Sequence, residues 1–362
     1  MNFSRRLLSL ILCLVFLFSF AACKKSDEEV ATEAETESTT TPVVTDINPL
    51  TGESGLNPDY IGKRSISVTI QNNNNGKCRP QWGLCDADVV IEAEVESLVT
   101  KYLFIYQDWS KLKKAGPFRS VRVDFVEMAM GFDSILCHWG WSNGVSYGAK
   151  ELLDATGYDH VNALSVSEIQ FRNSVAPSGV SASKEYCSYT TGESIINYIA
   201  KVNSDDKTTN DIRTELDTAK ATPFAFYDTA TALSGGECNS ISFKVGSNNA
   251  TFTYKDGLYY GAYGSKDMTD SEGTPYAVAN VVVLYSNEIK TMDGKGRVDM
   301  DLTEGTGVVA SNGTYQNITW TKGAAENAFK FFAEDGTEFK FNKGKTYIAI
   351  ARLSNADKTA LS

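Results

Sequence analysis

Stretches of alternating apolar and polar residues recur along most of the chain, and a period of two residues is typical of β-strands with one buried face. In residues 89–96, for example, Ile91, Ala93 and Val95 would share one face, and three glutamates would share the other. A tight turn at Ser97-Leu98 would join this strand to the next. The alternation predicts strands over residues 65–70, 89–96, 99–107 and 134–139 in the first half, and over 241–245, 250–254, 278–285, 315–321 and 346–353 in the second half.

Three segments of the first half have the period of an amphipathic helix instead. Residues 119–130 and 147–156 carry apolar stripes, and Thr190 with Glu193 forms a capping box ahead of a third stripe. Together with the strands, these helices predict an α+β fold. A mixed α/β N-terminal domain would span residues 48–205 and a β-rich C-terminal domain residues 220–362, with a polar junction at about 203–218.

The first residues fit neither domain. Arg5 and Arg6 precede an apolar run of about 14 residues, 7–20, which is followed by Ala21-Ala22-Cys23, whereas a membrane-spanning helix needs roughly 20. The pattern therefore predicts a signal peptide over residues 1–22, cleaved before a lipidated Cys23, rather than a transmembrane helix. Two acyl chains on that cysteine would be enough for stable anchoring.

Residues 23–47 would form a tether. They are acidic, rich in Glu, Ser and Thr, and lack aromatic residues, so they cannot bury enough apolar surface to offset their chain entropy. A random coil of this length reaches about 25–30 Å. We therefore expect an extracytoplasmic protein, lipid-anchored to the cell membrane.

Charge and cysteine content exclude several classes of partner and cofactor. The formal net charge of −11 argues against nucleic acid, which requires a basic surface. Five cysteines remain beyond Cys23, and an odd number cannot form a complete disulfide framework. Cys78 and Cys85 either pair or stay as free thiols. With only two histidines and no Cys-x-x-Cys, no metal site is predicted. Phe339 stands where a P-loop needs glycine, and no cofactor is predicted.

Three groups of polar residues are candidates for chemistry. Glu92 and Glu96 would share a strand face with Glu94, where crowded carboxylates could form a general acid or bind a cation. The alternative is a solvent-facing surface neutralised by Lys101 across the hairpin. His138, at the end of a strand, is either an acid, base or ligand group or a structural histidine.

The third group lies at the predicted start of the first helix. Arg119 and Arg122 are three residues apart and would point to similar sides. With Ser120 and the backbone N–H groups of the helix start, they could hold a phosphate or a carboxylate. The alternative is an arginine that pairs with the glutamate strand and holds the fold together.

The order and spacing of short sequence strings resemble the YerB-like family of bacterial lipoproteins, which is defined by a domain of unknown function. The strings include NPLTG at 48–52, RPQ at 79–81, GPFRSVR at 116–122, HWGWS at 138–142 and FR at 171–172, followed by NVV at 280–282, GTG at 305–307, WTK at 320–322 and GKTYI at 344–348. The resemblance implies an α+β first domain, a β-rich second domain, extracytoplasmic attachment and no established reaction. It also adds Arg172 to the candidate binding residues.

The chain departs from the family pattern at several positions. Lys101 stands where arginine is usual, Asn173 where aspartate is usual, and Ser97-Leu98 replaces a glycine pair. The histidine that usually follows Pro177 is absent. If that histidine were catalytic, this member would be inactive or altered.

Two functions fit these observations. The first is a binding or scaffolding lipoprotein of the cell envelope, with an envelope protein or a wall polymer as its partner and with Tyr259, Tyr260 and Tyr263 on an exposed aromatic patch. The second is an extracytoplasmic hydrolase-like enzyme that acts on an anionic envelope substrate. The enzyme hypothesis requires Glu92 or Glu96, His138 and an arginine to line one cleft.

Overall fold

The computed structural model describes residues 46–362, apart from 74, 144–146, 206–210, 218–222 and 292–293. The predicted signal peptide, Cys23 and nearly all of the predicted tether lie outside the described residues. Among the described residues, no helix is both long and apolar enough to cross a bilayer.

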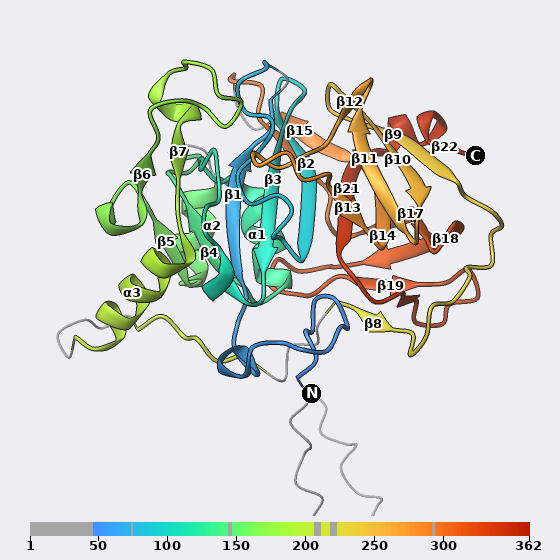
Figure 1. The fold of residues 1–362 in the computed structure, drawn as a ribbon, viewed down its shortest axis with the longest axis horizontal. Helices are drawn as coiled ribbons and strands as arrows, with labels where there is room; N and C mark the ends of the chain where they lie inside the picture. The colour runs from blue at the N-terminus through green and yellow to red at the C-terminus, as the bar shows by residue number, and fades with distance from the viewer. Residues whose placement is uncertain (1–45, 74, 144–146, 206–210, 218–222, 292–293) are drawn as a thin grey trace, which may run out of the picture. The chain divides into compact units, whose positions relative to one another are not determined.

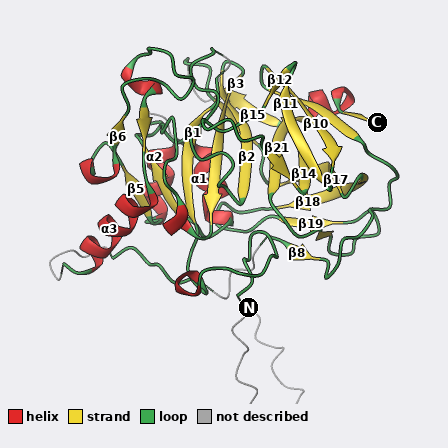
Figure 2. Cartoon of the chain, viewed as in Figure 1, coloured by secondary structure: helices red, strands yellow, loops and turns green. Residues whose placement is uncertain are grey.

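A mixed ten-stranded sheet contains strands from both halves of the chain (Figures 1 and 2). At its centre, β2 pairs antiparallel with β3 and parallel with β21. The sheet therefore runs across the predicted junction, and the two-domain division stays a prediction. In sheet order the strands are β19 (Lys330–Phe332), β18 (Thr314–Thr321), β17 (Glu304–Ser311), β14 (Asn280–Ser286), β21 (Thr346–Arg352), β2 (Val89–Glu96), β3 (Val99–Tyr106), β1 (Ile66–Gln71), β4 (Ile135–His138) and β5 (His160–Asn162).

A second, six-stranded sheet belongs to the second half alone. Its strands are β12 (Lys266–Asp267), β11 (Leu258–Tyr263), β10 (Asn248–Lys255), β9 (Ser240–Val245), β22 (Ala360–Leu361) and β13 (Ala277–Val278), which pairs with β11. Three two-stranded ribbons complete the β-structure: β6 (Phe171–Arg172) with β7 (Ser188–Tyr189), β8 (Ala225–Phe226) with β20 (Lys340–Phe341), and β15 (Glu288–Thr291) with β16 (Val298–Met300). The α+β fold class and the β-rich second half are confirmed.

The described α-helices all come from the first half: α1 (Val123–Gly131), α2 (Ala149–Thr156) and α3 (Gly192–Asn203). Short 3₁₀ turns lie at Pro58–Tyr60, Trp109–Lys111, Ser167–Ile169, Lys184–Tyr186 and Leu353–Lys358. The predicted capping box was wrong by one residue, because Thr191 and Ser194 cap α3 rather than Thr190 and Glu193.

The prediction that α1 begins at Arg119 was also wrong. The chain is extended there, because the Arg119 N–H donates to the carbonyl of Thr69 in β1 and the Arg119 carbonyl accepts from the Trp139 N–H, just after β4. The helix begins only after Arg122, its N-cap residue. Tertiary hydrogen bonds thus override the apolar spacing in residues 119–122.

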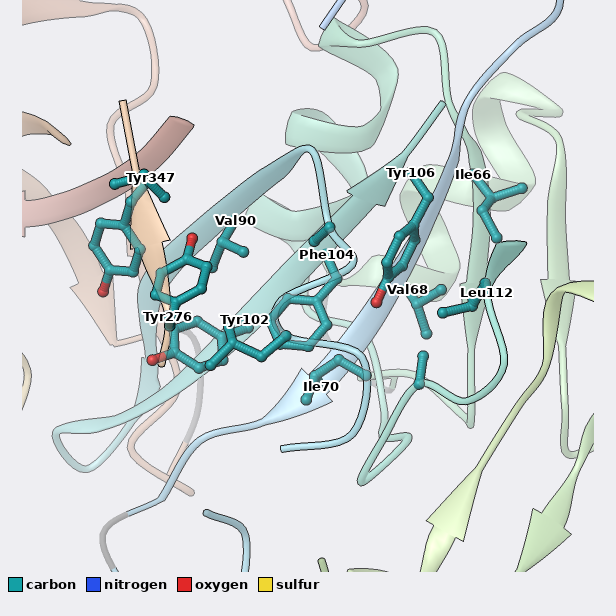
Figure 3. Close-up of a cluster of buried hydrophobic side chains, with 14 of the residues drawn as sticks. Ile66, Val68, Ile70, Val90, Tyr102, Phe104, Tyr106, Leu112, Tyr276 and Tyr347 are labelled. Atoms are coloured by element: carbon teal, nitrogen blue, oxygen red, sulfur yellow. The ribbon is translucent and has the colours of Figure 1, made fainter. Parts of the chain in front are cut away.

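Both faces of the central sheet are covered, so even the polar positions of β1 are buried. A row of aromatic side chains lies in the core on one face. Figure 3 shows Tyr102, Phe104 and Tyr106 of β3 in a row, with Tyr276 and Tyr347 of the second half at the Tyr102 end. The ring centroids of Tyr102 and Tyr347 lie 6.4 Å apart in an edge-to-face arrangement, which is a favourable geometry for aromatic pairs. This shared core joins the two halves.

The predicted β2–β3 turn is present at Ser97 and Leu98, which have φ angles of 51° and 65°. Positive φ at both central residues matches the twist of a two-residue hairpin and normally favours asparagine or glycine. The structure describes all five folded-region cysteines as free thiols, Cys78 and Cys85 included.

Candidate functional site

The three glutamates of β2 do not share one environment, contrary to the sequence prediction. A register shift between Glu94 and Glu96 interrupts the alternation. Glu92 and Glu94 are buried, whereas Glu96 is half-buried. Lys101 lies opposite Ala93 and donates to Gln71 Oε1 at 2.9 Å rather than to a glutamate of this strand, although its charge helps to lower the pKa of Glu96. A cluster of crowded carboxylates is therefore absent from this strand.

Glu92 instead receives five hydrogen bonds. Its Oε1 accepts from Asn72 at 2.9 Å, from Thr100 at 2.6 Å and from Asn248 at 2.7 Å. Its Oε2 accepts from the hydroxyls of Tyr263, at 2.8 Å, and Tyr347. The side chain is 0% exposed. Three of the five donors belong to the second half, so the Glu92 carboxylate links the two halves of the chain.

Glu96 and Arg122 form an ion pair. The guanidinium makes two parallel 2.8 Å bonds to the carboxylate, which is the strongest geometry for such a pair. Partial burial alone would raise the pKa of Glu96, but the hydrogen bonds and positive charge of Arg122 lower it below its usual value. This matches the predicted alternative in which an arginine pairs with the glutamate strand, and it leaves Arg122 committed to the fold.

His138 is enclosed. Its Nδ1–H donates to the Gly140 carbonyl at 2.8 Å, so its Nε2 accepts from His160 Nδ1 at 2.9 Å. Burial, followed by the neighbouring His160, lowers the pKa of His138 to about 3. A neutral, fully buried imidazole with both nitrogens bonded fits the structural alternative better than a proton-transfer role.

Arg119 and Arg172, in contrast, meet in one surface cavity of about 360 Å³. The guanidinium of Arg172 lies 4.3 Å from the centroid of the Trp139 ring, and Lys184 and Glu185 line the same cavity. We call this site, lined by Phe118, Arg119, Trp139, Arg172, Ser183, Lys184, Glu185 and Ser188, the arginine pocket.

Local backbone pairing builds the arginine pocket. Arg172 lies on β6, which pairs with β7 through Ser188. The Ser188 carbonyl accepts from the Phe118 N–H at 2.9 Å, so the β6–β7 ribbon docks beside the extended segment that carries Arg119. Ser120 lies on that segment too, but its hydroxyl donates to the Trp139 carbonyl at 3.0 Å.

The arginine pocket is cationic, and within it the Ser183 hydroxyl donates to Glu185 Oε1 at 3.3 Å. Arg119 Nη1 lies 3.5 Å from Glu185 Oε2, which is a long ion pair. Arg172 and Lys184 also line the pocket, so three cations face a single carboxylate. Burial, and then the positive charges of Arg122 and Arg119, lower the pKa of nearby Lys101 to about 7. Such a site can hold an anion.

The predicted aromatic patch is not where the sequence placed it. Tyr259 is 0% exposed, Tyr260 is half-buried, and the Tyr263 hydroxyl bonds to buried Glu92. Sequence reasoning also missed Trp139 and Lys184 as pocket residues. Trp139 was visible only as part of a family string, and nothing in the sequence marked Lys184.

The described residues contain no group of three or more His, Cys, Asp or Glu side chains placed to hold a metal ion. The candidate site residues thus separate into three surroundings. Glu92, Glu96 with Arg122, and His138 lie in structural networks, Ser120 holds the backbone, and Arg119 with Arg172 face a cavity.

Comparison with known proteins agrees with the sequence resemblance. Residues 50–205 match the "Protein of unknown function (DUF3048) N-terminal domain" and residues 240–348 match the corresponding C-terminal domain. The chain is 29% identical over 347 residues to the "Putative lipoprotein YerB" of Bacillus subtilis, with 94% of this chain and 93% of that protein covered. The crystal structure of the YerB protein from Bacillus subtilis is similar as well, with a TM-score of 0.70 at 28% identity, over 87% of this chain and 99% of that one. The predicted YerB-like membership is confirmed: the chain belongs to the DUF3048 family.

Proposed function

We propose that this chain is a lipid-anchored binding protein of the cell envelope that holds an anionic group in the arginine pocket. The observation that carries the proposal is the meeting of Arg119 and Arg172 in one cavity beside the Trp139 ring. Two guanidinium groups offer planar pairs of N–H donors that match a phosphate or a carboxylate.

The charge balance supports this proposal. The whole chain has a net charge of −11, yet the arginine pocket has three cations and one carboxylate. Stacking on Trp139 fixes the plane of the Arg172 guanidinium, and a 2.6 Å bond from Arg172 Nη1 to the Lys184 carbonyl fixes it further. A preorganised cation loses little side-chain entropy when an anion binds. Anionic wall polymers and acidic envelope proteins both carry suitable groups.

The anchor would place this pocket outside the cell membrane. The relative in Bacillus subtilis is named as a lipoprotein, and the cysteine after the apolar run in this chain is Cys23. Labelling with a palmitate analogue should mark the full-length protein, and Cys23→Ser should lose the label and leave the membrane fraction. Label or membrane retention unchanged in Cys23→Ser would refute the anchoring.

The binding proposal is tested by calorimetric titration of the full-length protein in detergent with inorganic phosphate and with acetate. Each guanidinium bond to an anion contributes about 1.5–3 kcal/mol, so Arg119→Ala and Arg172→Ala should each weaken binding about tenfold or more. Lys255→Ala, which removes an exposed charge elsewhere, is the matched control. Equal affinity in all four proteins, or no binding of either anion, would overturn the proposal.

The enzyme alternative requires an acid or base and an arginine in one cleft. Glu92 and His138 are each 0% exposed and held by internal hydrogen bonds, and Glu96 is paired with Arg122. This arrangement counts against an active site built from these residues and favours binding.

A further inference from the structure

A second cavity, of about 560 Å³, lies where the two halves of the chain meet. The loop with Arg79 and Gln81 lines it from the first half, and β10 with the β11–β12 hairpin lines it from the second. Small-molecule sites favour such boundaries and have volumes of roughly 300–1,000 Å³. We infer that this cavity, the inter-half pocket, binds a small hydroxylated organic acid of the sugar-acid class.

Arg79 supplies the positive charge of the inter-half pocket. Its Nε donates to Asn72 Oδ1 at 2.8 Å and its Nη2 to the Asn72 carbonyl at 2.9 Å. Its guanidinium carbon lies 3.8 Å from the centroid of the Tyr263 ring. The Nη1 of Arg79 donates to none of the described residues, so this fixed cation keeps N–H groups for a carboxylate.

Two amide oxygens supply acceptors. Gln81 and Asn248 are 2% and 4% exposed, and both line the inter-half pocket. The NH₂ group of Gln81 donates to the Gln71 carbonyl and to Asn72 Oδ1. The NH₂ group of Asn248 donates to Glu92 and Thr100. No described residue donates to either side-chain oxygen. Neither oxygen is sealed from solvent without a partner, so each is free to accept from a hydroxyl or amide N–H of an occupant.

The Glu92 network holds these groups in place. Glu92 accepts hydrogen bonds from Asn72, Asn248 and Tyr263. The same carboxylate therefore holds the residue that Arg79 bonds to, one of the two amide acceptors and the ring over which Arg79 lies. Locked rotamers of this kind are what a preorganised site needs. The buried Glu92 carboxylate would thereby position the lining of the inter-half pocket, a role separate from the arginine pocket and from packing alone.

The lining specifies the class of ligand. A carboxylate would face Arg79, and hydroxyl or amide hydrogens would face Gln81 and Asn248. Pro80 and Met268 offer apolar surface to the carbon skeleton. Lys266 and Asp267 also line the pocket and carry opposite charges, so Arg79 determines the net charge of the lining. None of these residues belongs to the arginine pocket, so this inference does not rest on the proposed function.

The test is calorimetric titration of the full-length protein in detergent with D-glucuronate, D-galacturonate and N-acetylmuramate. D-Glucose tests the need for the acid group, and acetate tests the need for hydroxyls. At least one sugar acid should bind about tenfold more tightly than either comparison compound. D-Glucose lacks the carboxylate that would pair with Arg79, and acetate lacks the hydroxyls that would bond to Gln81 and Asn248. Saturable binding of no sugar acid would overturn the inference.

Variants locate the binding. Arg79→Gln removes the cation and should weaken sugar-acid binding about tenfold or more. Ser247→Trp fills the pocket from an exposed rim position outside the Glu92 network and should abolish binding. Ser165→Trp, at an exposed position outside the pocket, is the matched control for bulk. Unchanged affinity in folded Ser247→Trp, or loss of sugar-acid binding in Arg119→Ala instead, would assign the ligand elsewhere and refute the inference.

Discussion

Replacing Glu92 with glutamine tests whether one buried carboxylate joins the two halves of the chain. The substitution keeps the shape of the side chain but exchanges an acceptor-only group for one that carries an NH₂ donor. Oε1 has three amide or hydroxyl donors, and Oε2 has two tyrosine hydroxyls. In Glu92→Gln, one of these sets must face another donor.

The magnitude follows from the number of bonds. A hydrogen bond to a charged group contributes about 1.5–3 kcal/mol, and a neutral one about 0.5–1.5 kcal/mol. The exchange therefore costs about 1 kcal/mol per bond, or roughly 5 kcal/mol for five bonds. The hydroxyls of Tyr263 and Tyr347 can rotate to accept from the new NH₂ group, so we expect a loss of about 3–5 kcal/mol in the free energy of unfolding.

Urea unfolding at pH 7 measures this loss. Glu304→Gln is the matched control, because Glu304 is exposed and should change stability by less than about 0.5 kcal/mol. Tyr347→Phe should cost less in the Glu92→Gln background than in the parent, since the two residues share a bond. A Glu92→Gln protein within about 0.5 kcal/mol of the parent would refute the role of the network.

Two further perturbations test the packing around the sites. Burial lowers the pKa of His138 from 6.5 to about 3. Between these pH values the unfolded chain binds a proton that the folded chain does not. The free energy of unfolding should therefore fall as the pH falls below 6.5, by up to about 1.4 kcal/mol per pH unit. Urea unfolding from pH 7.5 to 4.5 should show a shallower slope in His138→Asn, and equal slopes would contradict the assignment. Gly192→Ala would place a Cβ 1.8 Å from the Trp109 carbonyl oxygen, so we expect a loss of about 2–3 kcal/mol, and an unchanged melting temperature would show that α3 does not pack there as described.

Regular strands could be predicted from the sequence because alternation is a local signal. β2 was predicted with the bounds that the structure shows, and β18 and β21 to within a residue at each end. The two-residue strands of the ribbons were missed, since a segment this short carries no period. The start of α1 was missed because hydrogen bonds to distant strand ends hold Arg119 extended.

The site could be predicted only in part. Arg119 and Arg172 were both chosen, but the β6–β7 ribbon that brings them together is tertiary and leaves no pattern in the sequence. The glutamates were assigned to one face because strict alternation was assumed, and a register shift before Glu96 breaks it. Tyr263 was expected at the surface, since no local signal shows that its hydroxyl reaches buried Glu92.

The central claim is that Arg119 and Arg172 together hold an anion. The most direct measurement is a crystal structure of the protein soaked with selenate, an oxyanion that anomalous scattering locates without ambiguity. The account predicts an anomalous peak in the arginine pocket, within about 3 Å of N–H groups from both guanidiniums. A crystal with that pocket open to solvent and selenate bound only elsewhere, or not bound at all, would contradict it.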